Sequence, residues 1–114
     1  MKNPPGRYAK FTQGIIDTVL GAGHTASELR KAVMARAARL ASQRSGAPAP
    51  APFGNYVDKV AQHAYKVTDE DVAALQKAGS SDDVLFEVTA AAAVGAALGR
   101  LERGMAALQG REDD

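Results

Sequence analysis

Apolar side chains recur at intervals of three or four residues in several stretches of the chain, which is the spacing of one face of an α-helix. The first such stretch predicts a helix over residues 8–20, which ends at the glycine pair Gly21 and Gly23. The second predicts a helix that begins near Ser27 and continues to about Leu40. The apolar faces of these two helices are Phe11, Ile15, Ile16, Val19 and Leu20, and then Leu29, Val33, Ala37 and Leu40.

The second helix carries a local start signal. Thr25 is followed three residues later by Glu28, which is the pattern of a capping box in which each side chain binds a free backbone N–H of the first turn. We therefore expect Thr25 to be the N-cap residue. Three cations of this helix, Arg30, Lys31 and Arg39, lie off the apolar stripe and are expected in solvent.

A proline-rich linker occupies residues 46–52, where three prolines alternate with alanines. Alternate prolines forbid a helix and favour an extended, semi-stiff connection. We interpret it as a connection inside one domain, because the residues before it are too few for an independent core. Whether it folds back or exchanges between protomers is left open by the sequence. A third helix follows from about residue 53 to residue 64, with Tyr56, Val57, Val60 and Ala61 on its buried face.

The next two helices have strong start signals. Thr68 precedes three acids, Asp69, Glu70 and Asp71, and acids in a first turn are favoured by the helix dipole. This short fourth helix is expected to end at Gly79. Ser81 precedes two further acids and starts the last helix in the same way. The last helix is predicted over residues 82–108.

The last helix contains small apolar residues on every side from residue 90 to residue 99. A helix that is apolar all round is buried all round, and in a chain of this length such burial indicates a second subunit. Gly95 and Gly99 form a Gly-x-x-x-Gly pattern, which we interpret as a mark of close helix packing. The apolar stretch itself is too short to span a bilayer, which needs about 20 residues.

Composition agrees with a helical domain. The 114 residues suffice for one domain, residues 1–114, and alanine-rich sequence with 5% aromatics and no Trp suits closely packed helices better than sheets. The net charge of +1 is too balanced to predict nucleic-acid binding. No apolar run follows the first residues, so no signal peptide and a cytoplasmic location are expected. We predict an all-α fold of about five helices.

The chain has no cysteine, so it cannot form a disulfide, a thiolate metal site or a cysteine nucleophile by itself. The acids near residues 69–71 and 82–83 have no calcium-loop spacing and are expected at helix starts. We therefore expect no metal and no cofactor.

The second half of the chain resembles a known family. Residues 56–60, 68–75, 78–83 and 86–88 are similar to the carboxy-terminal half of the carboxymuconolactone decarboxylase and alkylhydroperoxidase D-like family, and residues 27–40 are similar, more weakly, to the helix that leads into its active site. The resemblance covers about two thirds of the chain. It implies an all-α fold in which a helical hairpin packs against partner chains in a homo-oligomer: a dimer, a trimer or a hexamer.

The resemblance also implies, for the peroxidase branch, a Glu, a Cys-x-x-Cys pair and a nearby His that form a proton relay. This chain departs from that pattern, because the proline linker follows residues 41–45 where the cysteine pair should open the next helix. No Ser or Thr replaces the pair at a matching spacing. The peroxidase residues therefore cannot be transferred.

Three residues remain candidates for catalysis. Glu28 is a candidate counterpart of the relay Glu, Arg36 could hold a carboxylate through two hydrogen bonds, and His63 could move a proton near neutral pH. The alternatives are a capping role for Glu28, a place at the edge of a subunit interface for Arg36, and a histidine at a helix end packed near Tyr65 for His63. His24 in the first loop is a weaker candidate.

Two functions of different classes follow. The first is a homo-oligomeric binding or structural module without thiol peroxidase activity, which binds a small molecule or another protein. The second is a cofactor-free lyase or isomerase acting on a carboxylated small molecule, with Arg36 holding the carboxylate. Peroxidase chemistry with thiols supplied by a partner is a third. Neither a nucleic acid nor a membrane is expected as a partner.

Overall fold

The computed structural model describes residues 6–113, and within them it contains five α-helices, a short 3-10 turn and no strand. The predicted all-α fold of five helices is confirmed. The elements are α1 (Gly6–Leu20), α2 (Ser27–Ala41), α3 (Gly54–His63), the turn η1 (Ala64–Lys66), α4 (Asp69–Lys77) and α5 (Asp82–Asp113).

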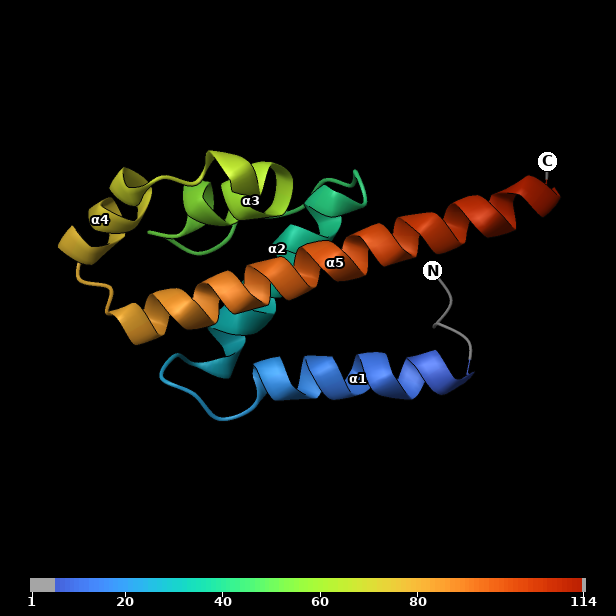
Figure 1. Cartoon of the computed structure of the whole chain (residues 1–114), viewed down its shortest axis with the longest axis horizontal. Coiled ribbons are helices and arrows are strands. Elements are labelled where there is room, and N and C mark those ends of the chain that lie inside the picture. Colours follow the sequence, from blue (N-terminus) through green and yellow to red (C-terminus); the bar gives the residue numbers. More distant parts are fainter. Residues whose placement is uncertain (1–5, 114) are drawn as a thin grey trace.

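Helix α5 is the axis of the molecule. Its 32 residues span about 48 Å at 1.5 Å per residue, which nearly equals the 50 Å long dimension of the chain. In Figure 1, α2 crosses behind α5, α3 and α4 lie on one side of it, and α1 lies on the other. The C-terminal end of α5 projects past the other helices (Figure 1). Every other helix is therefore positioned by its contact with α5.

The backbones of helices α2 and α5 are in close contact at two glycines of α5. A Cβ on Gly95 would collide with the carbonyl oxygen of Met34, and a Cβ on Gly99 would collide with that of Ala38. Glycine is needed at both positions because any larger residue would force the helices apart. The interpretation of Gly95 and Gly99 as marks of close helix packing is confirmed.

The hydrophobic core lies where α2, α3 and α5 meet. Val33, Val57 and Val88 from these three helices are fully buried. The proline segment folds back onto this core, since Ala49 and Phe53 at its end are buried as well. The Nη1 atom of Arg36 donates to the carbonyl of Gly46 over 2.9 Å and ties the start of the segment to α2.

The predicted ends of α4 are confirmed. The hydroxyl of Thr68 accepts from the backbone N–H of Asp71, and the Asp71 carboxylate accepts from the N–H of Thr68, which completes a capping box. Gly79 follows the helix with a φ of +106°, a conformation that favours glycine. Ser81 caps α5 by accepting from the N–H of Val84.

The predicted capping box of α2 is wrong. Ala26 is the N-cap residue and makes no side-chain cap, while Glu28 lies exposed beside Lys31. Thr25 is turned away from the helix and bonds with Glu87 of α5. The expectation that Arg30 is solvated is also wrong, because this side chain is 4% exposed. Thr25 has its partner in Glu87, 62 residues further along the chain, whereas Arg30 is buried because its guanidinium donates to carbonyls at the end of α1 and in the loop that follows.

The expectation that the middle of α5 is buried all round does not hold within one chain. Its inner face is packed, but Ala93 and Ala97 on the opposite face are exposed. The segment Asp82–Gly110 is also long and apolar enough to cross a membrane by length and composition, with 39% of its most apolar window buried inside the domain. This is weak evidence, since core helices of soluble proteins pass the same criterion.

Candidate functional site

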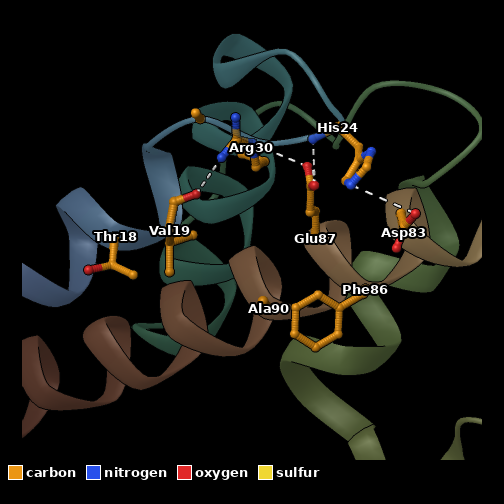
Figure 2. Close-up of a pocket in the computed structure, with 9 residues that line it drawn as sticks. Thr18, Val19, His24, Arg30, Asp83, Phe86, Glu87 and Ala90 are labelled. Carbon is orange, nitrogen blue, oxygen red and sulfur yellow. Dashed lines mark hydrogen bonds and ion pairs between the residues drawn. The ribbon is translucent and has the colours of Figure 1, made fainter.

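A pocket of about 510 Å³ opens between the end of α1, the loop that follows it and the first half of α5. Figure 2 shows the residues that line it. Its apolar lining comes mainly from Val19 and Ala22 on one side and Phe86 and Ala90 on the other. Its volume lies within the range of small-molecule pockets, which is about 300–1,000 Å³.

Glu87 holds the loop between α1 and α2 against α5. Its Oε2 atom accepts from the backbone N–H of His24 over 2.6 Å, and its Oε1 atom accepts from the N–H and the hydroxyl of Thr25 over 2.8 and 2.7 Å. A Cβ on Gly23 would lie 2.8 Å from Oε1, so the loop can approach this closely because a glycine precedes His24. The carboxylate thus serves as the acceptor for a bend in the chain.

Arg30 completes this clasp from α2. Its Nη1 atom donates to the carbonyls of Val19 and Gly21, both over 2.6 Å, and its Nη2 atom donates to the carbonyl of Thr25 over 3.0 Å. Its Nε atom is buried with no hydrogen bond among the described residues and lies 3.8 Å from Oε1 of Glu87. We call Arg30, Glu87 and Thr25 the polar clasp, because together they join α1, α2 and α5.

The clasp leaves no proton available for catalysis near neutral pH. The hydrogen bond from the His24 backbone and then the one from the Thr25 hydroxyl lower the pKa of Glu87 to about 2. A carboxylate with this pKa is ionised at neutral pH and a poor base, and a general acid needs a pKa near the working pH. The guanidinium of Arg30 is already bonded to three backbone carbonyls.

The polar groups at the mouth of the pocket are exposed. Nε2 of His24 lies 3.7 Å from Oδ2 of Asp83, and both side chains are mostly in solvent. The ring of Phe86 stands beside them and is 73% exposed (Figure 2). An exposed aromatic ring at the mouth of an apolar pocket is typical of a contact surface.

The three predicted catalytic residues have separate surroundings. Glu28 pairs with Lys31 on the surface of α2, Arg36 pairs with Asp58 of α3, and His63 packs edge-on against Tyr65 with ring centroids 5.9 Å apart. None of the three lines the pocket. The structure therefore brings none of them together, and the surroundings of His63 agree with the helix-end alternative.

Arg36 has the fork geometry that sequence analysis anticipated, but its carboxylate belongs to the protein. Nε donates to Oδ1 of Asp58 over 3.0 Å and Nη2 donates to Oδ2 over 3.1 Å. This hydrogen-bonded pairing raises the pKa of Arg36. A substrate carboxylate would have to displace Asp58, so Arg36 acts as a link between α2, α3 and the proline segment.

Sequence reasoning gave Arg30 and Glu87 no role. One signal could have drawn attention to Glu87, since it is the one charged residue between Asp83 and Arg100 in an otherwise apolar helix. An isolated charge in such a stretch usually has a partner. The partner itself could not be read from local spacing.

Among the residues that the structure describes, no three His, Asp or Glu side chains converge in a way that could hold a metal ion. No protein-family model, curated protein or solved structure matches the chain.

Proposed function

We propose that this chain is a cysteine-free relative of the carboxymuconolactone decarboxylase and alkylhydroperoxidase D-like proteins that assembles as a homo-oligomer. In this proposal it is a binding or structural module without thiol peroxidase activity. The resemblance of residues 56–88 supports the kinship, and the absence of cysteine supports the loss of thiol chemistry.

The observation that carries the proposal is a set of large apolar side chains left in solvent by the single chain. Phe11 and Ile15 are exposed on α1, and Phe86, Leu101 and Leu108 are exposed on α5. Phe86, Leu101 and Leu108 share one face of α5 by helical spacing, and an exposed apolar face of this kind marks an interaction surface. The largest exposed fractions in this set are those of Phe86, at 73%, and Phe11, at 68%.

The overall dimensions agree with this proposal. The Cα radius of gyration is 15.0 Å, whereas a compact chain of this length has a value of about 13 Å. The accessible surface is 7211 Å², against roughly 6,000 Å² for a compact monomer of this mass. The difference, about 1,200 Å², exceeds the roughly 800 Å² that one subunit buries in a standard interface and is of the size found in obligate homodimers.

The surroundings of Glu87 in the pocket and of Arg36 outside it favour binding over catalysis. Glu87 is ionised and saturated with hydrogen bonds, and Arg36 is occupied by Asp58. The lyase or isomerase alternative needs Glu28 or His63 beside Arg36, and the surroundings of these residues give it no support.

Two measurements on the purified chain test the proposal. Multi-angle light scattering at micromolar concentration is expected to give a mass of two or more times the 11.9 kDa of one chain. A peroxide-consumption assay with excess dithiol is expected to show no turnover above the dithiol blank. A strict monomer would contradict the oligomeric part, and robust turnover would contradict the loss of peroxidase activity.

A further inference from the structure

Helix α5 has a second apolar face, directly opposite the one that packs on α2. Its positions follow one another in steps of four, three, four, four, three and four residues. At 100° per residue they fall within about 80° of one another around the helix axis. We call this set the outer stripe: Phe86, Ala90, Ala93, Ala97, Leu101, Gly104 and Leu108.

The outer stripe is uncovered in the single chain. Ala90 is half-buried at the edge of the pocket, and the other six positions are exposed. None of the seven carries a charge or a hydrogen-bonding side chain. The stripe therefore spans about six turns of helix that offer water nothing but apolar surface.

The spacing of the stripe positions is the same in both directions along the helix. If two copies of α5 lie antiparallel with Ala97 at the centre, every position meets a position of the same stripe. The pairs are Ala97 with itself, Ala93 with the partner's Leu101, Ala90 with the partner's Gly104 and Phe86 with the partner's Leu108. A two-fold axis requires this kind of self-complementary surface.

We propose that α5 pairs antiparallel with α5 of a second copy of this chain through the outer stripe, around a two-fold axis at Ala97. The inference rests on the proposed function, because it names the surface through which the proposed oligomer forms. Small residues at the centre let the two helices approach to about 8 Å, the close end of helix packing distances.

Charge favours the antiparallel direction. Asp82 and Asp83 lie in the first turn of α5. Parallel pairing would place these acids beside those of the other copy, whereas antiparallel pairing about Ala97 keeps them at opposite ends of the helix pair. The two helix dipoles also oppose each other in this arrangement.

In this arrangement the partner's α5 covers the pocket. The partner's second half of α5 runs along the first half of this one, where Phe86 and Ala90 form one wall of the pocket. The C-terminal end of α5, which carries Leu108, projects beyond the other helices (Figure 1). The partner's Leu108, which is exposed in the single chain, would then cover the mouth beside Phe86.

A lipid bilayer is a less suitable occupant of the same stripe. Arg100, Glu102 and Arg103 fall inside the segment Asp82–Gly110 and would have to leave their protein partners if it spanned a bilayer. These residues instead bind the rest of the domain: Arg100 donates to the carbonyl of Ala61, and Glu102 pairs with Arg44 over 3.0 Å. Arg103 is directed toward the carbonyl of Ser42.

The test compares one substitution at two exposed alanines of α5. Ala97→Arg places two arginines together at the proposed axis, while Ala106→Arg adds the same side chain on the opposite side of the helix, beyond the core. We expect Ala97→Arg to weaken self-association by about 100-fold or more in sedimentation equilibrium, and Ala106→Arg to leave it unchanged. Helix content by circular dichroism should stay at the wild-type value in both variants.

The cysteine-free chain allows a second readout. Ala97→Cys introduces the sole thiol of the protein, and a cysteine at a two-fold helix crossing lies within disulfide reach of its own copy. Mild oxidation should convert this variant into a covalent dimer with wild-type helix content. Ala106→Cys, treated in the same way, should stay uncrosslinked at the same protein concentration.

The outcomes separate this inference from the proposed function. If self-association is unchanged by Ala97→Arg, or if the oligomer is strictly a trimer, the two-fold pairing is overturned and the proposed homo-oligomer remains. A wild-type monomer would overturn both. A monomer that sediments with phosphatidylcholine–phosphatidylglycerol vesicles, and no longer does so as Ala97→Arg, would assign the stripe to lipid and overturn the pairing.

Discussion

Helices α1 and α2 meet α5 in different ways. Helix α2 packs directly onto α5, since Gly95 and Gly99 leave no side chain between the two backbones. Helix α1 leaves Phe11 and Ile15 exposed and is joined to the rest mainly near its end, where Arg30 binds the carbonyls of Val19 and Gly21. One contact depends on shape and the other on hydrogen bonds, so they should respond to different perturbations.

The largest effect is expected from breaking the polar clasp. Arg30→Met removes the buried donors of three carbonyls and leaves Glu87 without its cation, so the free energy of unfolding should fall by about 3–5 kcal/mol. Urea unfolding followed by circular dichroism measures this loss. The matched control is Lys31→Met, an exposed cation on the same helix, which should stay within about 0.5 kcal/mol of wild type. Equal losses of unfolding free energy in the two variants would show that the polar clasp stabilises the fold no more than an exposed cation does.

A smaller loss is expected from separating α2 and α5. Gly95→Ala forces a methyl group against the carbonyl of Met34 and should lower the free energy of unfolding by about 1–3 kcal/mol. Its control is Gly14→Ala on α1, where a methyl group would meet nothing within 4 Å. That variant should gain about 0.5–1 kcal/mol, because alanine is the better helix former. A neutral Gly95→Ala would contradict the close contact.

Lowering the pH should weaken the polar clasp and leave the contact of Gly95 and Gly99 with α2 unchanged. The pKa of Glu87 is lowered from 4.5 to about 2, so its stabilising contribution is complete above pH 4.5 and is lost as the pH falls through about 2. Asp71 titrates in the same direction, because the Lys59 ammonium and the Thr68 backbone lower its pKa. The measurement is therefore a difference: wild type should lose more stability between pH 4.5 and pH 2 than Glu87→Gln. Identical profiles would show that Glu87 does not contribute.

The location of each residue's partners explains how much of the site the sequence could predict. The residues it singled out, Glu28, Arg36 and His63, were chosen for their chemistry, and each has an ordinary partner close by in the fold. For Arg36 the anticipated bidentate carboxylate exists as Asp58, 22 residues further along the chain. Arg30 and Glu87 were overlooked because their partners lie in other helices and in a loop.

The sequence by itself determined the five helices and most of their ends, and it marked Gly95 and Gly99 as points of close helix packing without identifying α2 as the partner. These features depend on the spacing of apolar residues and on hydrogen bonds within a single turn, so neighbouring residues suffice to specify them. Tertiary structure decided that Thr25 bonds with Glu87 rather than capping α2, and that Arg30 is buried. A buried polar group takes whichever partner the packing brings within reach, and that partner can lie sixty residues away in the sequence.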